Sequence, residues 1–179
     1  VRYHEYDKVN QAQLIILCSL NNLTEFERRY TIKLYNEIIG GSANSILFEN
    51  VREKHSYCYY VNSSVKAYDN ILLINSGVEQ ENIDKTIKLV RKTLKSINEG
   101  KLKEENIISA KNTIISGIKS ASDEPMGIIN TYFSKVLVGT PNEEERIANF
   151  NKITKEDIVK VSKKVTLHTI LTLESKEDE

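Results

Sequence analysis

The sequence predicts an α+β domain with a mainly antiparallel sheet of about four strands, covered on one face by helices. Two runs near the ends of the chain, 9–20 and 165–173, alternate in hydropathy with the two-residue period of strands. Two further strands, 57–66 and 71–76, are separated by a short turn and form a hairpin. Helical periodicity fills most of the rest, so the predicted order is β-α-α-β-β-α-α-α-α-α-β.

The first strand, 9–20, is apolar on both faces in its second half, which is typical of a strand with neighbours on both sides. Thr24 and Glu27 then stand three residues apart, in the arrangement of a capping box that opens a helix. We expect this helix to run to about Ile39. It should end at Gly40 and Gly41, because glycine tolerates the left-handed backbone that terminates helices.

The hairpin follows a second, short helix over 42–54, which has Leu47, Phe48 and Val51 as its apolar stripe. The strands 57–66 and 71–76 are joined by a turn over 67–70, where Asp69 and Asn70 are the turn-forming residues. A hairpin requires antiparallel pairing, so at least part of the sheet is antiparallel.

The remaining helices are predicted from apolar residues spaced three and four apart. One runs from Ile83 to about Gly100, and another spans 107–118. Ser122 or Asp123 is expected to cap a third, with Pro125 in its first turn. The apolar stripe of this third helix consists of Ile128, Ile129, Tyr132, Phe133, Val136 and Leu137. A short helix over 143–150 and a capped one from Thr154 precede the last strand, and we expect 174–179 to be a frayed tail.

Composition excludes several classes of function. Lys and Arg together number 25, as do Asp and Glu, so there is no surplus of cations for binding nucleic acid or an anionic membrane. No stretch approaches the roughly 20 apolar residues that span a bilayer. No signal-peptide pattern is visible, and we expect a cytoplasmic location. The cysteines, Cys18 and Cys58, are expected to be buried, reduced thiols, and the three histidines lack metal-ligand spacing.

One segment, 40–60, carries a specific resemblance. It reads Gly-Gly-Ser-Ala-Asn-Ser-Ile-Leu-Phe-Glu-Asn-Val-Arg-Glu-Lys-His-Ser-Tyr-Cys-Tyr-Tyr. The glycine pair, Leu-Phe, Val-Arg-Glu-Lys and the following tyrosine resemble the C-terminal half of the pitrilysin/insulinase zinc metallopeptidases, the inverzincins. The similarity extends over almost the whole chain, including Ser76-Gly77-Val78-Glu79 and the 153–158 segment.

The resemblance implies that 1–179 is a single C-terminal domain of a longer, peptidase-like chain. The family's zinc motif, H-x-x-E-H, is absent, so zinc is expected in the missing N-terminal half and no cofactor or metal in this chain. Such a unit is not active alone. Its partners would be a peptide substrate and the catalytic half of the same chain, or a homologous subunit. By resemblance, Arg52 and Tyr59, seven residues apart, would bind the peptide and stabilise the transition state of its hydrolysis.

Several alternatives stay open at this point. Arg52 could pair with Glu49, Glu53 or another acid on the surface of its helix, and Tyr59 could be a core aromatic residue of the strand. The longer chain could itself lack the zinc motif and act as a scaffold or substrate-binding partner of an active paralogue. The domain could also be an unrelated α+β interaction module, which predicts that Arg52 lies far from Tyr59.

Overall fold

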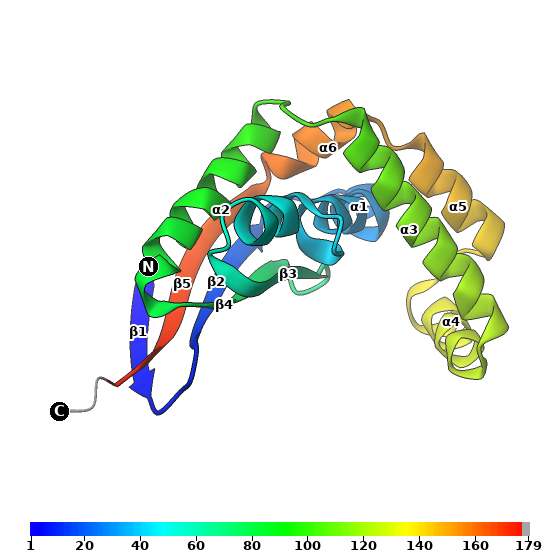
Figure 1. Cartoon of the computed structure of the whole chain (residues 1–179). Helices are drawn as coiled ribbons and strands as arrows, with labels where there is room; N and C mark the ends of the chain where they lie inside the picture. Colours follow the sequence, from blue (N-terminus) through cyan, green and yellow to red (C-terminus); the bar gives the residue numbers. More distant parts are fainter. Residues whose placement is uncertain (177–179) are drawn as a thin grey trace.

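The computed structural model describes residues 1–176 and consists of a five-stranded sheet with helices on one face (Figure 1). The strand order is β1-β5-β2-β4-β3, and every neighbouring pair is antiparallel except β1 and β5. The strands are β1 (Arg2–Asp7), β2 (Ala12–Leu20), β3 (Cys58–Lys66), β4 (Ile71–Val78) and β5 (Val165–Ser175). The predicted class, α+β with a mainly antiparallel sheet covered on one face, is confirmed.

The helices occur in the predicted order. The first, over 27–41, has α1 (Ile32–Asn36) between two π-helical segments, Glu27–Thr31 and Glu37–Gly41. A third π-helical segment, Phe48–Glu53, precedes β3. After β4, a 3₁₀ turn (Gln80–Asn82) leads into α2 (Ile83–Asn98), α3 (Glu104–Asp123), α4 (Pro125–Val138), α5 (Glu143–Lys152) and α6 (Lys155–Ser162). No helix within residues 1–176 is both long enough and apolar enough to cross a membrane.

The core lies between the sheet and the helices α1, α2 and α6. Every second residue of β2, from Ala12 to Leu20, is buried against these helices. Cys18 is one of them, and burial raises the pKa of its thiol to about 12. Both cysteines are buried and free, as predicted. We call the strands with α1, α2 and α6 the sheet body, and α3, α4 and α5 the helical arm, which extends beyond the sheet in Figure 1.

Two helices begin with the predicted capping boxes. The amide of Thr24 donates to the Glu27 carboxylate (2.7 Å), and the amide of Glu27 donates to the Thr24 hydroxyl (3.2 Å). The same reciprocal pair joins Thr154 and Asp157 at α6. Glu27 also accepts from Lys164 at 2.6 Å, which ties the first helix to the approach to β5. Burial alone would raise the pKa of Glu27, but the hydrogen bonds from Lys164 and Thr24 lower it below its ordinary value.

Three details of the prediction are wrong. The sheet has five strands instead of about four, because β1 was missed; all six of its residues are exposed, so it shows no apolar face. The tail expected from Glu174 is ordered through Ser175, since β5 pairs with β1 there; its last residues, 177–179, lie outside the described residues. Finally, neither Ser122 nor Asp123 caps α4, because α3 continues through both and Glu124 precedes Pro125.

Candidate functional site

Arg52 lies on the last turn of the π-helical segment Phe48–Glu53 and is exposed. Its guanidinium stacks over the ring of Phe48, four residues earlier, with 4.8 Å from Cζ to the ring centroid. Glu49, one of the two acids that could have paired with it, instead binds Lys54 at 2.7 Å, and among residues 1–176 no salt bridge joins Arg52 to Glu53. Arg52 is therefore exposed and stacked on an aromatic ring, and is not paired with Glu49.

Tyr59 occupies a β-bulge. Cys58 pairs with Val78 and Tyr60 with Gly77, so Tyr59 is an extra residue that faces no partner on β4. The bulge shifts the phase of the strand. Cys58 points into the core, and both Tyr59 and Tyr60 are exposed. Tyr59 is 57% exposed, so the alternative that it is a core aromatic residue is wrong.

The phenol of Tyr59 donates a hydrogen bond to the carboxylate of Glu79, the residue directly after β4. This bond favours the protonated phenol and raises the pKa of Tyr59 above its ordinary value. Tyr59 is thus a neutral donor on an exposed strand edge. Glu79 was part of the segment that carried the resemblance, but its role as the partner of Tyr59 could not be read from the sequence.

A tight turn brings the helix of Arg52 back against the start of β3. The amide of Ser56 donates to the Arg52 carbonyl and that of Tyr57 to the Val51 carbonyl, both at 3.0 Å, and Ser56 has a positive φ of 52°. Burial raises the pKa of Cys58, and the nearby positive charge of Arg52 acts in the opposite direction. Arg52 therefore lies close to the residue preceding Tyr59. Within residues 1–176, no hydrogen bond joins the two side chains directly.

Tyr60 follows Tyr59 in β3 and lies on the uncovered face of the sheet. Its hydroxyl donates to Gln13 Oε1 at 2.5 Å. The aromatic ring crosses over Gly77, where a Cβ atom would lie 2.5 Å from Tyr60 Cε1. Registry places Glu5, Leu173, Gln13, Gly77 and Tyr60 in one row across all five strands.

This row borders a cavity of about 320 Å³ on the uncovered face. Its lining includes half-buried Ile15, Leu171 and Leu173 together with polar Gln13 and Asn75. A cavity lined mainly by apolar side chains, with a few polar groups among them, is typical of a binding site. Sequence reasoning predicted neither Tyr60 nor Gln13 as part of the site, because the bulge that exposes Tyr60 depends on pairing with β4.

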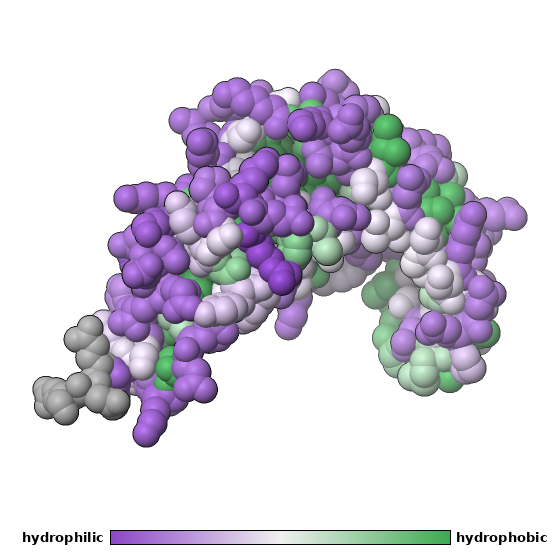
Figure 2. Space-filling view, viewed as in Figure 1, coloured by the Kyte–Doolittle hydropathy of each residue, from purple (hydrophilic) through white to green (hydrophobic). Residues whose placement is uncertain are grey.

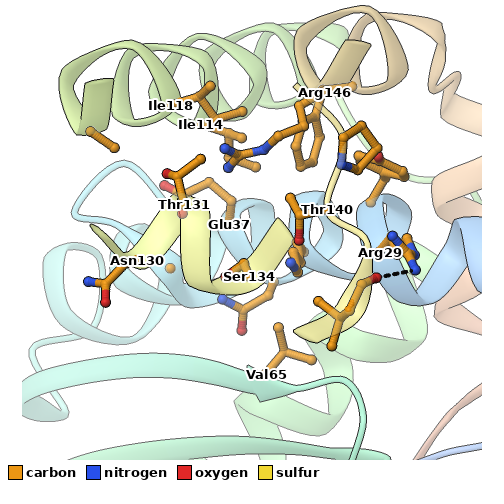
Figure 3. A pocket seen from close by; sticks show the side chains of 18 of the residues that line it. Arg29, Glu37, Val65, Ile114, Ile118, Asn130, Thr131, Ser134, Thr140 and Arg146 are labelled. Atoms are coloured by element: carbon orange, nitrogen blue, oxygen red, sulfur yellow. Dashed lines mark hydrogen bonds between the residues drawn. The ribbon is translucent and has the colours of Figure 1, made fainter. Parts of the chain in front are cut away.

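A larger cavity, of about 740 Å³, lies between α4, α3 and the first helix (Figure 3). Ile114 and Ile118 of α3 border it, and Arg29, Glu37 and Arg146 bring charge to it. Neither Arg52 nor Tyr59 lines this cavity, so it is separate from the region that contains these two residues.

Residues 1–176 contain no group of three or more His, Cys, Asp and Glu side chains that could hold a metal ion. The described part of the chain therefore offers no set of side chains that fits zinc.

Residues 1–114 match the family model described as Peptidase M16 inactive domain. The chain is 28% identical over 147 residues to YmfF of Bacillus subtilis strain 168, described as a probable inactive metalloprotease; the match covers 82% of this chain and 34% of YmfF.

Two crystal structures have the same fold. A conserved protein from Enterococcus faecalis V583 superposes with a TM-score of 0.91 and 25% identity over 99% of this chain and 43% of its own. A peptidase M16 inactive domain from Pseudomonas fluorescens gives a TM-score of 0.81 and 18% identity over 99% of this chain and 44% of its own. The chain therefore spans about a third of the curated relative and less than half of each solved chain.

Proposed function

The chain belongs to the M16 peptidase family, the pitrilysin/insulinase group, as its inactive, non-catalytic half, and we propose that it lines the peptide chamber of a longer zinc-dependent metalloendopeptidase. Zinc and the hydrolytic water would belong to the other half, either in the same chain or in a homologous subunit. The observation that carries the proposal is the bulge that directs Tyr59 outwards, next to the turn that holds Arg52.

In this proposal Arg52 and Tyr59 act as donors to the peptide. A guanidinium and a phenol can each donate to a backbone carbonyl, which recognises peptides independently of their side chains. The same donors would stabilise the negative charge that develops on the scissile carbonyl oxygen. The hydroxyl hydrogen of Tyr59 is directed at Glu79 in this structure, so it would turn from this carboxylate to the peptide on binding.

The test replaces Tyr59 by Phe in the full-length protein. Removing a donor to the developing oxyanion should lower kcat/KM for peptide cleavage by about a hundredfold. Tyr68→Phe is a matched control, because Tyr68 is 55% exposed, close to the 57% of Tyr59, but lies in the β3–β4 turn. Equal rates for Tyr59→Phe and the unmodified protein would disprove the catalytic role of this hydroxyl.

A second candidate function is favoured by the relative from B. subtilis. The name of YmfF describes a probable inactive metalloprotease, and the alignment, at 28% identity, covers 82% of this chain. The longer protein would then lack H-x-x-E-H and serve as a scaffold or substrate-binding partner of an active paralogue. The discriminating observation is the coding sequence upstream of Val1. If the motif is absent, Tyr59→Phe should weaken peptide binding and leave the partner's intrinsic cleavage rate unchanged. The cytoplasmic location stays a prediction in either case.

A further inference from the structure

Helix α4 has its polar side turned towards the protein and its apolar side turned away. Gly127, Asn130, Thr131 and Ser134 line the cavity of about 740 Å³ beneath it (Figure 3). On the opposite arc, six large apolar side chains are between 54% and 69% exposed: Ile128, Ile129, Tyr132, Phe133, Val136 and Leu137. A solvent-exposed helix on the surface of a globular protein shows the reverse arrangement, with its apolar stripe facing the core.

The orientation of α4 is fixed at its C-terminal end. The guanidinium of Arg29 donates to the carbonyls of Val138 (2.8 Å) and Gly139 (3.0 Å), and Gly139 takes the left-handed backbone that caps the helix. Arg29 itself is held by Glu25 at 2.5 Å. These contacts hold the helix with its apolar side chains on the outside of the molecule, where another surface can contact them. In Figure 2, green, hydrophobic side chains gather at the end of the molecule formed by α4.

We propose that the outer face of α4 docks onto the adjoining domain of the longer chain; this inference rests on the proposed function only in requiring that such a domain exists. The neighbours from E. faecalis and P. fluorescens match 99% of this chain, α4 included, and each has more than half of its own length outside the match. That remainder is large enough to form a second domain. Contiguous exposed apolar patches of this kind mark interaction surfaces.

A lipid surface fits the helix less well. Helices that lie on membranes are rich in Lys and Arg on the polar face. The polar face of α4 consists of small neutral residues, and Lys135 is the single charged residue in the helix. That neutral face is also turned into the cavity, where it could not reach lipid headgroups. An apolar protein surface is therefore the occupant that matches this chemistry.

The test is cysteine labelling in the full-length protein. Ile129→Cys reports on the outer face of α4, and Ile108→Cys on α3 is a matched control, since the two isoleucines are 56% and 52% exposed. Both native cysteines of this unit are buried. Maleimide modification is followed at each site by peptide mass spectrometry, and each rate is divided by the rate in urea. We expect the normalised rate at position 129 to be about tenfold or more below that at position 108.

Each other outcome overturns the proposal. Equal normalised rates at positions 129 and 108 would show that the face stays open. Protection that is lost on dilution would identify a second copy as the occupant, and protection that requires anionic phospholipid vesicles would identify a membrane. Val136→Cys, at a side chain that is 67% exposed, provides a second reporter if Ile129→Cys does not fold. The readout needs no cleavage, so a protein that protects α4 but hydrolyses no peptide would retain the docking and lose the peptidase role.

Discussion

The sheet body and the helical arm both contain large apolar residues, but the body buries them, whereas α4 of the arm exposes them. In the body, alternate residues of β2 and the inward sides of α1, α2 and α6 form one continuous core. In the arm, α3 and α5 are attached through Ile107, Ile118 and Phe150, whereas α4 buries no residue at all. An apolar pattern in the sequence thus identifies the face of a helix or strand that is to be buried against another protein surface. Whether the chain itself covers that side is decided by tertiary structure.

The strongest test of this contrast compares two isoleucines. Ile16 is fully buried at the centre of β2, and Ile129 is 56% exposed on α4. Ile16→Ala should lower the free energy of unfolding of the 179-residue chain by about 2–5 kcal/mol, because it removes buried methylene groups and leaves a cavity. Ile129→Ala should change it by less than about 0.5 kcal/mol. Urea denaturation followed by circular dichroism measures both, and similar losses at the two sites would mean that α4 is packed within this chain.

Two glycines provide a comparison of intermediate size. A Cβ atom at Gly40 would lie 2.6 Å from Ser63 Oγ and 2.9 Å from the Ser63 backbone nitrogen, because the first helix closely approaches β3 there. Gly40→Ala should therefore destabilise the chain by about 1–3 kcal/mol through overpacking. Gly117, within α3, has no atom within 4 Å of such a position. Gly117→Ala should stabilise by about 0.5–1 kcal/mol, since alanine favours the helix. Thermal unfolding of both variants checks the opposite signs.

The sequence was sufficient for elements with strong local signals. The capping boxes at Thr24 and Thr154, the hairpin and the order of the helices are confirmed, because each depends on residues within a few positions of one another. The strand β1 could not be predicted in this way. Its six exposed residues have no apolar face, and its pairing with β5 joins positions more than 160 residues apart.

The candidate site shows the same limit. The spacing and resemblance identified Arg52 and Tyr59, and the turn at Ser56 brings the helix of one against the strand of the other. The bulge that turns Tyr59 and Tyr60 outwards depends on register with β4, which strand periodicity does not specify. Similarly, the stripe predicted for α4 consists of the correct residues, but periodicity defines which residues share a face and not where that face points.

The smallest expected effect concerns Glu27, which joins the first helix to Lys164 in the sheet body. Because hydrogen bonds lower the pKa of Glu27 in the folded chain below the ordinary value of 4.5, its ionised form stabilises the fold above that pH. This contribution is lost as the pH falls through the lowered pKa. Glu27→Gln should therefore lower the free energy of unfolding by about 1–2 kcal/mol at pH 7, and this loss should shrink below pH 4.5.

Glu144→Gln, at an exposed position of α5 in the arm, is the control and should change the free energy of unfolding by less than about 0.5 kcal/mol. Urea denaturation between pH 3 and pH 7 measures both, and a cost of Glu27→Gln that stays constant across this range would show that the carboxylate charge does not stabilise the body.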